Sequence, residues 1–323
     1  MAVYTEVDAD SAAALLRTVG AGALRTLAGA AGGIENTNYF VESDAGDWVL
    51  TLFERLGFEQ LPFYLGLMQH LARRGLPVPE PRTDAGGALV HRLAGKPAAL
   101  VNRLPGAPVD APDARHCGLI GQFLARMHLQ ALDFPGRQDN LRGLAWWERT
   151  VPIVRPHVAP DQAARLDGEL AWQHRLHDAP ATKALPRGPV HADLFRDNAL
   201  FDGPQQAPRL SGVFDFYFAG IDALAYDLAV CLNDWAIDVD SGRLQEERAQ
   251  ALVAAYHAER PLGAGEQRAL PGLRRAAALR FWLSRLADWY LPRPAALLSP
   301  KDPAHFERVL QDCIARPWHP GLA

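Results

Sequence analysis

A short strand-rich stretch, residues 189–218, interrupts a long run of helical sequence in the second half of the chain. Within it, His191, Asp193 and Asn198 stand between two short apolar segments. Apolar segments of this length, bounded by turn-forming residues, are typical of buried strands. The chain must therefore fold so that a tight polar loop lies between two short strands. Helical spacing of apolar residues predicts helices around this stretch, over residues 116–130, 144–154, 160–178, 223–237, 243–259 and 268–291.

The first hundred residues are richer in strands. Helical spacing of small and apolar residues predicts a helix over residues 8–28, which ends in a Gly/Ala-rich segment. A second helix is expected over 59–74, where Gly75 and the prolines after it stop the pattern. Alternating apolar positions separated by turn residues predict the strands, over 37–42, 47–53, 87–91 and 98–103.

The polar loop has the spacing of a phosphotransferase catalytic loop, H-x-D-x-x-x-x-N. In that template the residue at Asp193 orients the attacking hydroxyl, and Asn198 binds magnesium. An apolar strand ends at Asp215, where the second metal ligand is expected, because magnesium prefers oxygen ligands. His191 is expected to support the loop structurally, and Asp227, at a helix start, to brace it. Each feature is common by chance alone, but their order along one chain favours a phosphotransferase.

Together these patterns predict an α+β chain with a bilobal, protein-kinase-like fold. The expected division is a small β-rich N-terminal lobe over residues 1–104, which binds nucleotide, and a larger, mainly helical C-terminal lobe over 105–323 for catalysis and substrate binding. No internal repeat competes with this interpretation.

Charge and composition restrict the partners. The chain has 33 Lys and Arg against 37 Asp and Glu, a formal charge of −4, so the basic surface of a nucleic-acid-binding protein is not expected. No apolar run approaches the ~20 residues that span a bilayer, and no signal peptide is recognised at the N-terminus. Three widely separated cysteines suit a reducing compartment. We expect a cytoplasmic monomer or homodimer acting on a small molecule.

The sequence resembles the aminoglycoside-phosphotransferase-like kinases in three segments, 191–198, 212–220 and 226–230. Within that family it is similar to the homoserine kinases built on this scaffold, which are unrelated to those of the GHMP fold. The supporting segments are 33–41, 48–54, 61–64, 75–79, 233–235 and 280–285. The resemblance implies ATP- and Mg²⁺-dependent phosphorylation of the side-chain hydroxyl of L-homoserine to O-phospho-L-homoserine, a step of threonine biosynthesis.

The expected ATP site departs from the wider kinase pattern. Strand alternation places Thr51 where the phosphate-binding lysine normally stands, and the chain's only lysines are Lys96, Lys183 and Lys301. The missing positive charge is expected to come from Arg55, or magnesium is expected to neutralise more of the phosphate charge. A Gly/Ala-rich segment stands in place of a consensus glycine-rich loop. The expected ATP-binding residues are Gly33, Asn36, Val49, Thr51, Val101 and Arg103.

Homoserine is a zwitterion, so its site needs a cation for the carboxylate and an acid for the ammonium group. The candidate substrate-binding residues are Arg196, Tyr217, Asp234 and Arg280. Trp282 falls on an apolar stripe and is expected in the core. The alternative acceptors are choline, methylthioribose and aminoglycosides. The missing lysine also leaves open a non-catalytic, nucleotide-binding pseudokinase.

Overall fold

The structure, a computed structural model, describes residues 5–30, 36–291 and 301–322. These residues form two compact units. The first unit contains described residues of the segments 1–106 and 211–217, and the remaining described residues form the second. Each unit is considered by itself.

The first unit is built on a five-stranded antiparallel sheet with the strand order β1-β2-β3-β5-β4. The strands are β1 (Leu24–Gly29), β2 (Asn36–Ser43), β3 (Gly46–Phe53), β4 (His91–Leu93) and β5 (Lys96–Asn102). The helices are α1 (Ala9–Thr18) and α2 (Leu61–Ala72). β2 and β3 form the predicted hairpin in full register, from Asn36 opposite Phe53 to Ser43 opposite Gly46.

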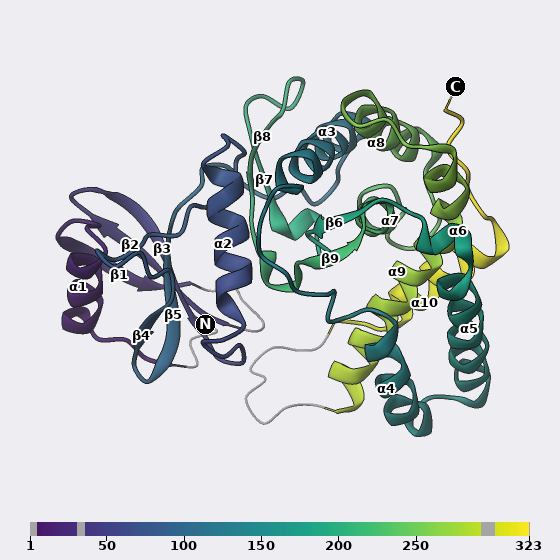
Figure 1. Ribbon diagram of the computed structural model, residues 1–323, viewed down its shortest axis with the longest axis horizontal. Coiled ribbons are helices and arrows are strands. Elements are labelled where there is room, and N and C mark those ends of the chain that lie inside the picture. The colour runs from purple at the N-terminus through teal and green to yellow at the C-terminus, as the bar shows by residue number, and fades with distance from the viewer. Residues whose placement is uncertain (1–4, 31–35, 292–300, 323) are drawn as a thin grey trace. The chain divides into compact units, whose positions relative to one another are not determined.

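The two faces of this sheet have different roles. One face packs its alternate residues, among them Val41, Leu50 and Leu100, in a core shared with Leu15 and Leu16 of α1. Figure 1 shows α1 lying beside β1 and β2. Burial of these apolar side chains is the main source of stability for the unit. The residues between them, on the opposite face, are therefore available for other contacts.

Two predictions for the first unit were wrong in detail. Residues 24–29 form β1 rather than the end of a helix. Its pairing with β2 shifts register between Leu24 and Thr26, so that Leu24 and Leu27 come to share a side of the strand and imitate helical spacing. The strand expected at 87–91 begins only at His91, because Asp84 and Gly87 form a turn before it.

The second unit is mainly helical and confirms the expected fold class. Its helices are α3 (Ala114–Ala131), α4 (Leu144–Val154), α5 (Pro160–Asp178), α6 (Pro180–Lys183), α7 (Leu224–Trp235), α8 (Glu246–Glu259), α9 (Ala264–Tyr290) and α10 (Ala304–Ala315). Every residue of α7 is buried, and so is Trp282 of α9, as expected for a core position. α10 was not predicted. Its Phe306 stacks on Phe281 of α9, with 5.0 Å between ring centroids.

Short strands frame the predicted catalytic loop. β6 (Arg187–Val190) pairs with β9 (Gly220–Ala223), and β7 (Ala199–Asp202) pairs with β8 (Arg209–Val213). The loop between β6 and β7 contains the 3₁₀ turn η2 (Arg196–Asn198). Two further 3₁₀ turns are η1 (Arg155–His157) and η3 (Phe216–Phe218).

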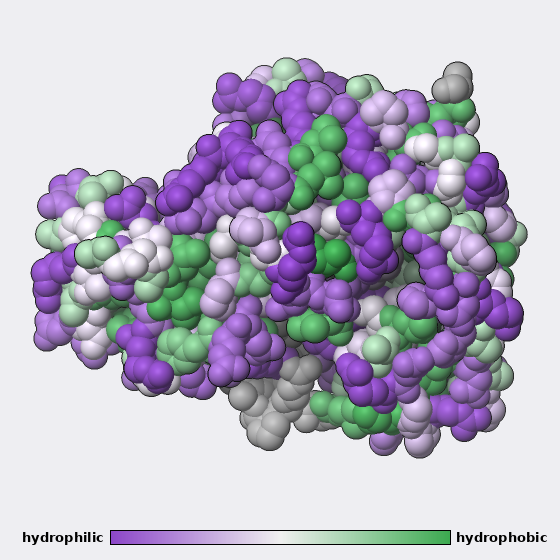
Figure 2. Space-filling model, in the orientation of Figure 1, coloured by the Kyte–Doolittle hydropathy of each residue, from purple (hydrophilic) through white to green (hydrophobic). Residues whose placement is uncertain are grey.

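The surface mixes polar and apolar side chains. On the face that Figure 2 shows, hydrophilic residues are interspersed with smaller hydrophobic groups. Among the described residues, no helix combines the length and the apolar character that crossing a membrane would require.

Candidate active site

The backbone of the catalytic loop is fixed by Asp227 of α7. One carboxylate oxygen accepts a hydrogen bond from the amide of His191 at 2.7 Å, and the other accepts one from the amide of Ala192 at 2.8 Å. Ala192 has the left-handed backbone angle φ of 62°. That conformation is unfavourable for a residue with a Cβ, and strained backbone of this kind concentrates at functional sites. The two bonds hold the turn that presents Asp193.

Electrostatics agree with this bracing role. Complete burial would raise the pKa of Asp227, but hydrogen bonding and charge from His128, together with the His191 amide, outweigh it and hold the pKa below its ordinary value. The carboxylate therefore stays ionised and keeps both amide bonds. His191 is also fully buried, and its Nδ1 accepts a hydrogen bond from the Asp193 amide at 3.3 Å. Its contacts are those of a supporting residue.

Both carboxylate oxygens of Asp193 are held by neighbours in the second unit. Nη1 of Arg280, on α9, lies 3.3 Å from Oδ1. Nδ2 of Asn198 lies 3.2 Å from Oδ2 and also donates to the Asp193 backbone carbonyl at 2.8 Å. Arg280 is 2% exposed, and its guanidinium lies over the rings of Phe218 and Phe281. Asp193 is thus oriented by residues that are themselves fixed.

The surroundings of Asn198 suit its predicted role as a metal ligand. Its amide nitrogen faces two oxygens of Asp193, which fixes the orientation of the amide and turns Oδ1 away from them. A carbonyl oxygen of this type is a ligand that magnesium accepts. Among the described residues, no cluster of three or more His, Cys, Asp or Glu side chains could hold a metal.

Asp215 belongs to the first unit and follows the end of β8. It is half-buried and has a left-handed φ of 63°, as Ala192 does. Burial, with the nearby Asp215 carboxylate, raises the pKa of Tyr217, while a hydrogen bond with Thr51 opposes the shift. The Tyr217 ring packs edge-on against Phe53, 4.8 Å between centroids. Tyr217, predicted to bind substrate, is therefore anchored in the first unit.

The predicted ATP-binding residues that the structure describes share one face of the five-stranded sheet, opposite α1. Val49 pairs directly with Val101, and Thr51 pairs with Asn38 and with Ala99. Asn36 belongs to the same face by alternation, and Arg103 lies over the ring of Phe40, the cross-strand partner of Val49. Gly33 lies outside the described residues.

Thr51 is buried and bonded at the position expected for the lysine. Its hydroxyl donates to Oδ1 of Asn38 at 2.7 Å. Lys96 does not replace it, since strand alternation puts it on the face of Ala98 and Leu100, where it pairs with Glu54 at 3.0 Å. The sheet therefore brings no lysine to the Thr51 face.

Arg196 and Asp234, both predicted to bind substrate, bind one another. Oδ2 of Asp234 accepts from the Arg196 amide at 2.8 Å and from its Nε at 3.2 Å. The Arg196 guanidinium also donates to the carbonyls of Asp110 and Asp234. Burial raises the pKa of Asp234, and the charge of Arg196 opposes the rise. The pair links the catalytic loop to the end of α7.

A model of the phosphotransferase enzyme family matches residues 26–279, well over half of the chain. The chain belongs to this family. A homoserine kinase of Polaromonas naphthalenivorans is 57% identical over 318 residues, which cover 98% of this chain and 99% of that protein. A homoserine kinase of a Janthinobacterium species is 49% identical, covering 96% and 95%. The resemblance noted in the sequence is confirmed.

Solved structures of two other kinases share the fold. An amicoumacin kinase in complex with AMP-PNP and Ca²⁺ matches with a TM-score of 0.66 at 18% identity, covering 92% of this chain and 90% of that one. A microcompartment-associated aminopropanol kinase matches with a TM-score of 0.64 at 19% identity, covering 95% of each chain. The family match confirms the expected phosphotransferase class, and these structures confirm the expected bilobal α+β fold.

Sequence reasoning missed two buried residues behind the catalytic loop, His128 and Tyr256. His128 of α3 is fully buried, with Nε2 3.1 Å from Oδ2 of Asp227 and Nδ1 2.7 Å from the hydroxyl of Tyr256 on α8. The signal that could have found it is a histidine inside the apolar stripe of α3, between Leu124 and Ala131. A polar side chain at such a position requires a buried partner.

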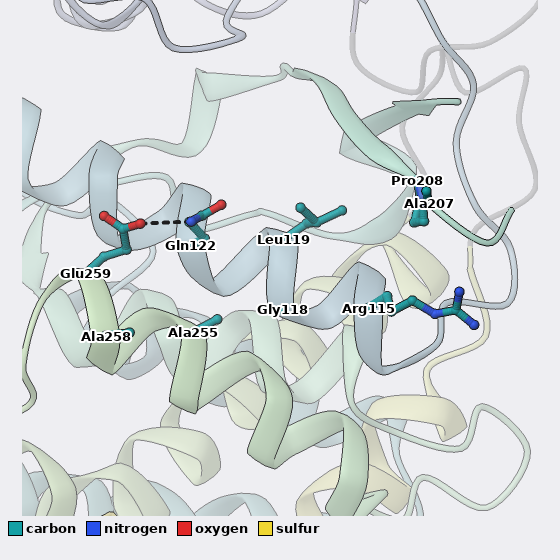
Figure 3. A pocket seen from close by; sticks show the side chains of 9 residues that line it. All are labelled: Arg115, Gly118, Leu119, Gln122, Ala207, Pro208, Ala255, Ala258 and Glu259. Carbon is teal, nitrogen blue, oxygen red and sulfur yellow. Dashed lines mark hydrogen bonds between the residues drawn. The ribbon is translucent and has the colours of Figure 1, made fainter. Parts of the chain in front are cut away.

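An open depression of about 440 Å³ lies elsewhere on the second unit, between α3, α8 and the loop before β8 (Figure 3). Gln122 and Glu259 form one end, joined by a 2.8 Å hydrogen bond, and Arg115 lies toward the other. None of the predicted site residues lines it.

Proposed function

We propose that the chain phosphorylates the side-chain hydroxyl of L-homoserine with ATP, giving O-phospho-L-homoserine and ADP, a step of threonine biosynthesis. The observation that carries the proposal is full-length similarity to relatives named homoserine kinase, 57% identical in the case of the Polaromonas protein. The catalytic loop supports it, because Asp193 and Asn198 have the arrangement that phosphoryl transfer requires.

Asp193 orients the substrate hydroxyl and accepts its proton. The hydroxyl oxygen attacks the γ-phosphorus of ATP while the bond from that phosphorus to ADP breaks, and the proton passes to the carboxylate. Arg280 and Asn198 hold the two carboxylate oxygens, at 3.3 and 3.2 Å. A carboxylate fixed at both oxygens is positioned for one direction of approach, which is the main contribution a protein makes to this chemistry.

Asn198 and Asp215 are the proposed Mg²⁺ ligands. A bound Mg²⁺ neutralises charge on the transferring phosphoryl group. For ATP we propose Asn36, Val49, Thr51, Val101 and Arg103, which share one sheet face, together with Gly33. Thr51 supplies a hydroxyl without charge, so either Arg55 or a larger contribution from the metal replaces the neutralisation that a lysine provides in other kinases.

Among the proposed substrate-binding residues of the second unit, Arg280 has the strongest support, because it contacts Asp193 directly. Arg196 and Asp234 remain proposed contacts, although their side chains already bind one another. Tyr217 remains a candidate from the first unit.

The deciding experiment measures coupled ATP turnover by the purified protein on homoserine, choline, methylthioribose and a representative aminoglycoside under the same conditions. Homoserine should be the preferred substrate. Serine should be poor, because its hydroxyl, one methylene shorter, cannot reach Asp193 and the γ-phosphate while the amino-acid group stays anchored. If another alcohol is phosphorylated efficiently and homoserine is not, that alcohol replaces homoserine as the proposed substrate. Nucleotide binding without any turnover would support the pseudokinase alternative.

We further propose that the protein acts in the cytoplasm as a monomer or homodimer. All three cysteines are buried free thiols, and burial raises the pKa of Cys117 to about 12, so reactive thiolate is scarce there. Sedimentation of the purified protein would distinguish the two assembly states.

A further inference from the structure

Arg280 carries a buried edge that nothing in the described residues satisfies. Nη1 contacts Asp193, whereas Nε and Nη2 are buried and have no hydrogen-bond partner there. These two nitrogens share one edge of the planar guanidinium. That edge is the side-on fork that matches the two oxygens of a carboxylate. A buried donor left unpaired is costly, so a buried fork with neither nitrogen paired indicates a ligand.

The position of the fork is fixed. Arg280 lies on α9 at 2% exposure, and its guanidinium is 3.7 Å from the centroid of the Phe281 ring and 4.8 Å from that of Phe218. Contact with Asp193 holds the third nitrogen. An arginine restrained in this way loses little further freedom when an anion binds, which favours recognition of one geometry.

The spacing to Asp193 suits a short hydroxy acid. The guanidinium that contacts Asp193 through Nη1 presents its fork on a neighbouring edge. In homoserine three carbon atoms separate the hydroxyl oxygen from the carboxylate carbon, a span of about 5 Å when extended. A carboxylate in the fork would therefore leave the hydroxyl within reach of Asp193.

We infer that the Nε–Nη2 edge of Arg280 binds the α-carboxylate of the substrate and so makes the enzyme specific for a hydroxy amino acid over the corresponding amino alcohol. This inference rests on the proposed function and names the residue that selects the carboxylate. One guanidinium thereby fixes both the catalytic Asp193 and the acid group of the molecule it acts on.

The test compares L-homoserine with 3-amino-1-propanol, which is homoserine without its carboxylate. Coupled ATP turnover gives kcat/KM for each substrate in the wild type and in Arg280→Met and Arg280→Lys. The wild type should prefer homoserine by at least about 30-fold, the effect of leaving a buried polar group unpaired. Arg280→Met should reduce that preference to within a few-fold of unity. Arg280→Lys keeps the charge but loses the fork, so it should retain only part of the preference for homoserine.

The ratio separates selection from catalysis. Loss of the Asp193 contact slows both substrates, whereas loss of the fork affects homoserine alone. If both substrates slow by the same factor and the preference persists, Arg280 acts only through Asp193 or the phosphoryl group, and the inference is overturned. Failure of the proposed function would appear earlier, as a wild type that does not phosphorylate homoserine.

Two further measurements guard against a folding artefact. Arg275→Met, on the same helix, breaks an ion pair with Glu169 and should lower the melting temperature but leave the substrate preference unchanged. Homoserine should raise the melting temperature of the wild type by more than that of Arg280→Lys, because stabilisation by a ligand grows with its affinity. An equal rise in both proteins would also contradict the inference.

Discussion

The Nε2 atom of His128 lies 3.1 Å from a carboxylate oxygen of Asp227, and both side chains are completely buried. The same carboxylate oxygen accepts the amide of His191 in the catalytic loop. On its other side His128 contacts the hydroxyl of Tyr256, which Arg260 also approaches at 3.2 Å. Arg260 pairs with Glu266 at the start of α9, the helix of Arg280. A buried polar chain therefore connects the loop of Asp193 to that helix.

His128→Leu should weaken this support. It leaves the buried Asp227 without one partner, a change that typically costs about 3–5 kcal/mol of stability. We expect kcat to fall by about 10- to 100-fold with a smaller change in the KM for ATP, because the loop and not the nucleotide face is disturbed. His128→Gln, which can still donate, should recover part of kcat. Steady-state kinetics and thermal melts of each variant provide the check.

Tyr256→Phe is the matched control for that variant. It keeps the ring and removes one hydroxyl, so a loss of about 1 kcal/mol and a small change in kcat are expected. If Tyr256→Phe is as damaging as His128→Leu, the effect depends on the hydrogen bonds of the Tyr256 hydroxyl rather than on the contact of His128 with Asp227.

The depressed pKa of Asp227 predicts a pH dependence of stability. A carboxylate with a lower pKa in the folded state stabilises the fold at pH values above its ordinary pKa of about 3.9, and this contribution disappears as the pH falls through the lowered value. The melting temperature of the wild type should therefore exceed that of Asp227→Asn by a constant amount from pH 7 to about pH 5, and the difference should shrink in more acidic buffer. A difference that is independent of pH down to pH 3 would show that the charge is not responsible.

The parts of the fold that sequence predicted well are those specified locally. The β2–β3 hairpin and the loop from His191 to Asn198 each depend on residues close together in the chain. β1 was misread because its irregular pairing with β2 is decided by the partner strand. α10 was missed although Phe306, Val309, Leu310 and Cys313 have helical spacing and are buried, since proline-rich sequence precedes it.

The contacts within the site were much less predictable. Arg280 reaches Asp193 across 87 residues of sequence, and Arg196 reaches Asp234 across 38. Helical periodicity places Asp234 on the same face as Asp227, but it does not show that an arginine occupies its carboxylate. Which candidate cation keeps free donors is a property of packing, so only the structure separates Arg280 from Arg196.

Asp193→Ala should reduce turnover by about 10²- to 10⁴-fold while nucleotide still binds, since the residue acts on the hydroxyl and not on ATP. Asp215→Ala should weaken Mg-nucleotide binding as well, because a metal ligand is lost. Kinetics and calorimetric titration with Mg-AMP-PNP measure the two effects separately.

Asp197→Ala is the control within the same loop. Its carboxylate is exposed and pairs with Lys301 at 2.7 Å, so turnover should change by less than about threefold, within the range of an exposed pair. Turnover near the wild-type level in folded Asp193→Ala would refute its catalytic role.

Thr51→Lys tests how the nucleotide face neutralises phosphate. Thr51 is 6% exposed, and its hydroxyl bonds Asn38. In kinases with a lysine here, a helix glutamate pairs with it, but α2 has no acidic residue. An ammonium group introduced without that partner is costly to bury, so the variant should melt several degrees lower and show no gain in ATP affinity. Thr51→Ser, which keeps the hydroxyl, should behave nearly as the wild type in both respects. Tighter ATP binding by Thr51→Lys at an unchanged melting temperature would mean that the pocket already provides a carboxylate for a cation at this position.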